Sequence, residues 1–88
     1  MTQPLPIVMY ARPTCEDSEL ARDRLNELGI PFTEINVDTD EAAARYVERV
    51  NHGFRSTPTI VFGAEAFIVV EPTVDELDEA LRRAGYQV

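Results

Sequence analysis

The sequence contains one cysteine and one histidine, and it has no lysine and no tryptophan. A single cysteine excludes a disulfide within the chain, so we expect a reducing compartment, the cytoplasm. With one histidine and one cysteine, we also expect no metal site within a single chain. No apolar run approaches the ~20 residues that cross a bilayer. The first six residues lack a basic side chain and do not resemble a secretion signal.

Positive charge is also scarce. All eight basic residues are arginines, sixteen residues are acidic, and the net charge is −8. This field repels phosphate, which argues against binding to nucleic acid or to anionic membranes. The 88 residues, 44% of them hydrophobic, fit one compact domain over residues 1–88. We expect this domain to be a monomer.

Hydrophobic periodicity and turn residues predict the order β-α-β-α-β-β-α. The predicted strands cover residues 7–10, 32–37, 59–62 and 67–70, and the predicted helices begin near residue 14, within residues 38–41 and near residue 73. The first strand is a continuous apolar run, which indicates burial on both faces. The third strand should run antiparallel to the first. Burying every apolar face then requires one four-stranded mixed sheet with three helices covering both sides.

Two helix starts carry the pattern of a capping box, in which a Thr side chain and an acidic side chain three residues later cap each other's backbone. Thr14 and Asp17 form the first such pair, and Thr73 and Glu76 the second. A turn that begins at Gly63 joins the last two strands into a predicted hairpin.

Cys15 is the only strong nucleophile in the chain. It lies where the first strand gives way to the first helix, and free N–H groups at a helix start favour a thiolate. Arg12, three residues earlier, adds positive charge, whereas Glu16 and Asp17 oppose ionisation. Because the position favours a thiolate, we expect a lowered thiol pKa and a functional cysteine rather than an inert buried one.

Ser18 falls on the same face of the first helical turn as Cys15. Three interpretations stay open. Its hydroxyl can donate a hydrogen bond to the thiolate, it can be an ordinary first-turn serine, or it can stand where a resolving cysteine was replaced. In every case a second thiol is missing from this position.

The predicted topology brings Thr57 and Pro58 beside Cys15, because the third strand begins where the first strand ends. A cis bond between Thr57 and Pro58 would present the Thr57 backbone to a partner. Arg55 can add positive charge at this end of the sheet or be a solvated loop residue. Tyr10 can line the approach to Cys15 or belong to the core.

Two segments together resemble glutaredoxin-like proteins, especially mycoredoxins and the small redoxins that reduce ribonucleotide reductase. They are residues 10–15 (YARPTC) and residues 51–59 (NHGFRSTPT). The resemblance covers residues 6–85 and implies a thioredoxin fold with thiol–disulfide exchange. It implies that Cys15 is the nucleophile, that Arg12 is the basic position before it, and that Thr57 with a cis Pro58 is the docking turn for the substrate.

The Cys-x-x-Ser pattern implies a monothiol mechanism in which Cys15 reduces protein disulfides or protein–thiol mixed disulfides. The co-substrate would be a low-molecular-weight thiol, namely glutathione, mycothiol or bacillithiol, with no tightly bound cofactor. Two alternatives remain. A non-catalytic thioredoxin-fold adaptor ranks second. A dimeric iron–sulfur carrier ranks third. Monothiol glutaredoxins that carry such clusters have a Cys-Gly-Phe-Ser site and a nearby lysine, and this chain has neither.

Overall fold

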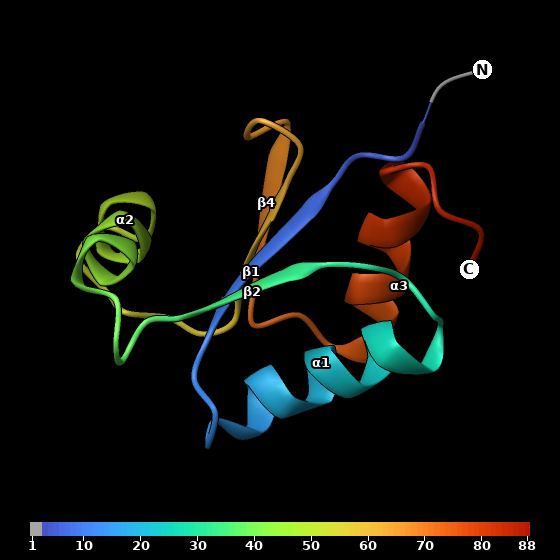
Figure 1. The fold of residues 1–88 in the computed structure, drawn as a ribbon. Coiled ribbons are helices and arrows are strands. Elements are labelled where there is room, and N and C mark those ends of the chain that lie inside the picture. Colours follow the sequence, from blue (N-terminus) through green and yellow to red (C-terminus); the bar gives the residue numbers. More distant parts are fainter. Residues whose placement is uncertain (1–2) are drawn as a thin grey trace.

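The structure is a computed structural model that describes residues 3–88 (Figure 1). Four strands and three helices occur in the predicted order. They are β1 (Ile7–Ala11), α1 (Glu16–Glu27), β2 (Thr33–Asn36), α2 (Glu41–Val50), β3 (Thr59–Phe62), β4 (Phe67–Val70) and α3 (Val74–Arg83). Within residues 3–88, no helix is both long and apolar enough to cross a membrane.

The four strands form one mixed sheet in the order β2-β1-β3-β4. β1 is parallel to β2 and antiparallel to β3, and β3 is antiparallel to β4. The register pairs Tyr10, near the end of β1, with Thr59, the first residue of β3. The predicted antiparallel arrangement is therefore confirmed, and the segment before β3 meets the segment after β1.

The helices cover the sheet from both sides, with α1 and α3 on one face and α2 on the other (Figure 1). The main core lies between the sheet and the pair α1 and α3. Its fully buried side chains include Met9, Leu25, Ile60, Phe62 and Leu81. This apolar contact is the main force that fixes α1, and with it Cys15, at the end of β1.

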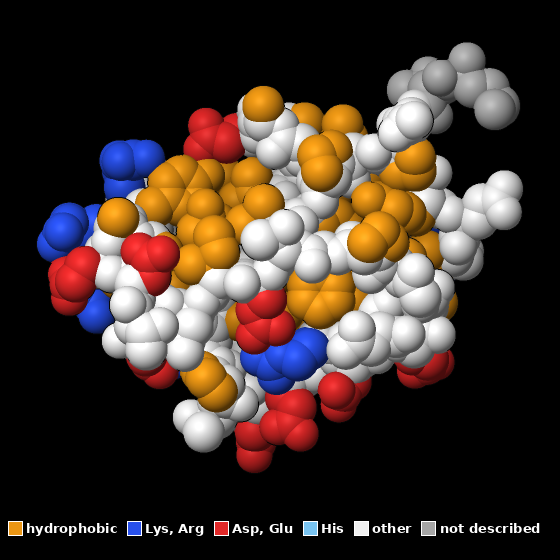
Figure 2. Space-filling view, viewed as in Figure 1, with side chains coloured by type: hydrophobic (Ala, Val, Ile, Leu, Met, Phe, Trp, Pro, Cys, Tyr) orange, Lys and Arg blue, Asp and Glu red, His pale blue; other side chains and the backbone are white. Residues whose placement is uncertain are grey.

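The opposite face has a smaller core, built on Val47 and its neighbours in α2. The expectation that β1 is buried on both faces was wrong, because Val8 and Tyr10 are only half-buried. The physical reason is that one helix, α2, covers this face, whereas α1 and α3 together cover the other. In the view of Figure 2, hydrophobic side chains remain visible over the sheet beside α2.

The two predicted capping boxes have different outcomes. At α3, the Thr73 hydroxyl accepts from the Glu76 N–H at 3.1 Å and the Glu76 carboxylate accepts from the Thr73 N–H at 2.8 Å. At α1, the predicted pair of Thr14 and Asp17 was wrong, because Thr14 lies in the preceding turn and the N-cap residue is Cys15.

Candidate active site

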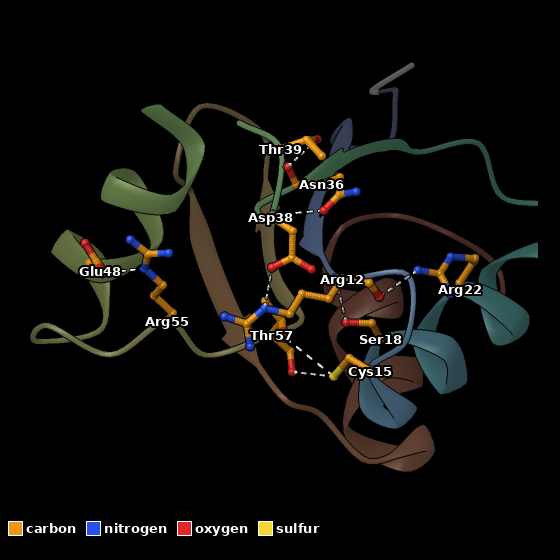
Figure 3. Close-up of polar contacts among 10 residues, drawn as sticks. All are labelled: Arg12, Cys15, Ser18, Arg22, Asn36, Asp38, Thr39, Glu48, Arg55 and Thr57. Atoms are coloured by element: carbon orange, nitrogen blue, oxygen red, sulfur yellow. Dashed lines mark hydrogen bonds and ion pairs between the residues drawn. The ribbon is translucent and has the colours of Figure 1, made fainter. Parts of the chain in front are cut away.

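Cys15 occupies the N-cap of α1 with an extended backbone, and its side chain is half-buried. Its Sγ lies 3.5 Å from the Thr57 carbonyl oxygen, to which the thiol donates, and 3.5 Å from the Thr57 hydroxyl, which donates to the sulfur. The peptide bond between Thr57 and Pro58 is cis. The thiol therefore faces the peptide that the sequence places beside it (Figure 3).

Partial burial raises the pKa of the Cys15 thiol, but hydrogen bonds to the sulfur outweigh this effect, and the pKa lies below its ordinary value of 9.0. The hydroxyls of Ser18 and Thr57 make the larger contributions, followed by the N–H groups of Ser18 and Asp17. The neutral thiol makes no N-cap hydrogen bond of good geometry. The same N–H groups face the sulfur closely enough to stabilise a thiolate.

Ser18 is fully buried, and its Oγ accepts a hydrogen bond from the Arg12 N–H at 3.3 Å. Because the oxygen already has a donor, the hydroxyl proton is free to point at the sulfur of Cys15. Of the three interpretations of Ser18, the geometry favours a hydrogen-bond donor to the thiolate. An ordinary first-turn serine would more often face water at a helix start.

Arg12 and Arg55, two further predicted site residues, both pair with acidic side chains. The Arg12 guanidinium donates to Asp38 at 3.1 Å, and that carboxylate lies just beyond β2. Arg55 donates to Glu48 of α2 at 2.6 Å, so its charge is directed away from Cys15. Figure 3 shows both pairs.

Tyr10 belongs to the smaller core. Its ring packs against Tyr46 of α2 with a centroid distance of 5.1 Å, and burial raises its pKa, helped by Asp40 and Glu65. Of its two interpretations, the structure therefore favours the core one.

Hydrogen bonds also fix the chain that carries the cis peptide. The Thr59 hydroxyl donates to the Ser56 carbonyl at 2.7 Å and accepts from the Asn51 side chain at 3.1 Å. On the other side, the Glu71 N–H donates to the Pro58 carbonyl at 2.9 Å. Thr57 is thus held between β3, β4 and the end of α2, which presents a defined edge beside the sulfur.

Sequence reasoning missed two residues that shape the site, Asp38 and Arg22. Asp38 neutralises the Arg12 side chain, and Arg22 donates to the Arg12 carbonyl at 3.3 Å. A signal for Arg22 was present, because it follows Cys15 by seven residues and therefore lies on the same helix face two turns later. Nothing in the local sequence marks Asp38.

Chemically, this arrangement can place a disulfide against a thiolate. The sulfur of Cys15 is accessible, its ionised form is stabilised, and Thr57 supplies backbone groups for an extended partner. Among residues 3–88, no group of three or more His, Cys, Asp or Glu side chains is arranged to hold a metal ion. The groups present at the site are those of thiol–disulfide exchange.

Comparisons with known proteins agree with this description. The Glutaredoxin family model matches residues 7–68. Gene 56 protein of Mycobacterium phage L5 is 32% identical over 77 residues, which cover 86% of this chain and 72% of that protein.

Two solved structures share the fold. The glutaredoxin grx-1 of Archaeoglobus fulgidus is 26% identical with a TM-score of 0.69, and the match covers 90% of this chain and 87% of that one. The glutaredoxin-like protein NrdH-redoxin of Escherichia coli is 24% identical with a TM-score of 0.70, over 85% and 93% of the two chains. The match to the family model covers more than half of the chain and includes Cys15, Thr57 and Pro58, so the chain belongs to the glutaredoxin family of thioredoxin-fold redox proteins.

Proposed function

We propose that this protein is a monothiol oxidoreductase that acts through Cys15 on mixed disulfides between a protein and a low-molecular-weight thiol. One observation carries the proposal: the accessible sulfur has a lowered pKa and lies 3.5 Å from the Thr57 carbonyl, next to the cis Pro58. A nucleophile and a docking edge are the two parts that the exchange reaction needs.

In the first step, the Cys15 thiolate attacks the sulfur of the small thiol within the mixed disulfide. The old S–S bond breaks, a new S–S bond joins Cys15 to the small thiol, and the protein thiolate leaves and takes a proton from solvent. The hydroxyl and N–H groups around Cys15 stabilise the attacking thiolate in its resting state. The backbone of Thr57 offers hydrogen-bonding groups to the chain that carries the leaving sulfur.

In the second step, a second molecule of the small thiol attacks the small-thiol sulfur of the new disulfide. Cys15 leaves as the thiolate, and the two small thiols depart as their own disulfide, having supplied the two electrons. Ser18 has no sulfur with which to resolve the intermediate, so the resolving thiol must come from outside. This supports a monothiol cycle with a small thiol as co-substrate and no tightly bound cofactor.

The lowered pKa of Cys15 also favours catalysis over the alternative of a non-catalytic adaptor, for which a thiol pKa at or above the free value would be expected. The proposal includes a single domain that works as a monomer in the reducing cytoplasm. Glutaredoxins generally act on protein disulfides with thiol co-substrates, and which thiol serves here is part of the test.

The experiment is turnover of a protein mixed disulfide, prepared in turn with glutathione, mycothiol and bacillithiol and assayed with the matching free thiol. We expect turnover with at least one of the three thiols and complete loss of it in Cys15→Ser. Ser56→Ala is the matched control, because this half-buried serine precedes Thr57 and the hydrogen bonds of the sulfur go to Thr57 instead. No Cys15-dependent turnover with any thiol would remove the proposal.

A further inference from the structure

Arg22 of α1 makes a forked ion pair with Glu34 of β2. Its Nε and NH2 groups donate to the two carboxylate oxygens at 2.8 Å and 2.7 Å. The same NH2 group also donates to the Arg12 carbonyl at 3.3 Å (Figure 3). The pair is partly shielded, with 22% of the Arg22 side chain and 29% of the Glu34 side chain exposed. A two-point contact of this kind fixes the direction of the guanidinium.

Arg12, whose carbonyl accepts from Arg22, is also hydrogen-bonded to Cys15 and to Ser18. Its carbonyl also accepts from the Cys15 N–H at 3.5 Å, and its own N–H donates to the Ser18 hydroxyl at 3.3 Å. Movement of the turn between Arg12 and Cys15 would therefore change two things together: the place of the sulfur and the direction of the Ser18 hydroxyl. Both determine how well the thiolate is hydrogen-bonded.

We propose that Arg22 is a positioning residue that holds the active-site turn against β2, with Glu34 as its anchor, and thereby keeps the Cys15 thiol reactive. The catalytic meaning of this inference rests on the proposed function, but the reactivity of the thiol can be measured without turnover. The hydrogen bonds of Arg22 go to Glu34 and to the Arg12 carbonyl, not to the sulfur. Arg22 acts through the Arg12 peptide and Ser18.

An effect of charge and an effect of position predict opposite results for thiolate formation in Glu34→Ala. If Arg22 and Glu34 acted only through their fields, Glu34→Ala would remove a negative charge and make the thiolate easier to form. If they act by position, Glu34→Ala loosens the fork, weakens the hydrogen bonds to the sulfur and makes the thiolate harder to form. Arg22→Lys tests the same point, because lysine keeps the charge but donates from a single point.

The same helix offers a matched control. Arg24 also makes a forked pair, with Asp78 of α3 at 2.9 Å and 2.8 Å, and its side chain is likewise 22% exposed. Arg24→Gln therefore removes a forked ion pair with a more buried carboxylate from α1, and none of the Arg24 hydrogen bonds goes to the Arg12 turn. It separates a general loss of helix packing from the specific effect on the thiol.

The experiment measures the rate of iodoacetamide alkylation of Cys15 against pH for the wild type and the four variants. At a pH below the thiol pKa, we expect Arg22→Gln and Arg22→Lys to react about threefold more slowly, because less thiolate is present. Glu34→Ala should also react more slowly, and Arg24→Gln should match the wild type. Denaturant unfolding of each variant verifies that it is folded under the assay conditions.

A wild-type rate in Arg22→Lys, a faster reaction in Glu34→Ala, or an equal slowing in Arg24→Gln would each overturn the positioning role. Because Glu34 lies on an edge strand with its side chain partly in water, its variant stays informative if an Arg22 variant does not fold. Failure of the proposed function would instead show as absent turnover in the wild-type protein. The alkylation rates would still decide the role of Arg22.

Discussion

At the scale of single residues, the reactivity of Cys15 depends on hydrogen bonds more than on neighbouring charges. Both Arg12 and the acidic pair after Cys15 were expected to influence the thiol. In the structure Arg12 is paired with Asp38, and the groups that lower the thiol pKa are hydroxyls and N–H groups. Such contacts act over short distances and are little affected by salt, so the thiol should keep its character across ionic conditions.

The lowered pKa of Cys15 has a consequence for stability. The folded thiol ionises at a lower pH than the unfolded one, so between the folded pKa and the ordinary value of 9.0 the unfolded chain binds more protons. Thiolate formation therefore contributes stability that is fully present above the ordinary pKa and is lost as the pH falls through the folded pKa. We expect the stability of the wild type relative to Cys15→Ser to rise with pH over this window.

The measurement is urea unfolding of both proteins under reducing conditions, from mildly acidic pH up to the ordinary thiol pKa. The serine variant is its own control for every other titrating group, because only position 15 differs. A difference in unfolding free energy that stays constant or falls with rising pH would contradict a lowered thiol pKa.

At the scale of elements, the starts of α3 and α1 differ in how they are capped. The reciprocal Thr73–Glu76 contacts at α3 satisfy two backbone N–H groups, whereas α1 begins at Cys15 with no side-chain cap. We expect Thr73→Ala to cost about 1 kcal/mol of unfolding free energy. Thr14→Ala, the same change at the turn before α1, should cost much less, because Thr14 caps nothing.

Denaturant midpoints for these two threonine variants test the comparison directly. Both remove the same atoms from an exposed position, so the difference between them isolates the cap. Equal losses would mean that Thr14 contributes to the start of α1 after all.

The element order, the hairpin and the antiparallel third strand could be predicted because they depend on local periodicity and turn residues. The start of α1 could not, because the local Thr14-x-x-Asp17 pattern places the N-cap one residue before Cys15, which is the N-cap in the structure. A local pattern does not contain the contacts by which Ala21 and Leu25 of α1 pack in the main core. The half-buried state of Val8 likewise depends on which helices cover each face of the sheet.

The candidate site, like the fold, could be predicted from the sequence only in part. Cys15, Thr57 and Pro58 could be brought together from topology alone, since the end of β1 meets the start of β3. The partners of Tyr10 and Arg55 could not be predicted, and both lie in α2. Tyr46, which packs on Tyr10, is far away in the sequence, and Glu48, which pairs with Arg55, lies outside the segment 51–59.

At the scale of the whole molecule, the net charge is negative and acidic side chains lie directly after the thiol in the chain. The net charge is −8, and Glu16, Asp17 and Glu19 all lie in the first turn of α1, beside Cys15. Figure 2 shows acidic side chains gathered along the lower side of the molecule, where α1 lies in Figure 1. A field of this kind steers cationic reactants toward the site and repels anionic ones.

We therefore expect cystamine, a cationic disulfide, to oxidise Cys15 faster than the anionic dithiodiglycolate at low salt. The ratio of the two rates should fall about tenfold as salt is added, because salt screens the field between exposed charges. Glu16→Gln should weaken this salt dependence. Glu27→Gln changes the net charge equally, but at the far end of α1, about 16 Å away at the helical rise of about 1.5 Å per residue. It should leave the salt dependence of the rate ratio nearly unchanged. Stopped-flow rates across a salt series measure both effects, and a rate ratio independent of salt would show that the acidic surface does not select the partner.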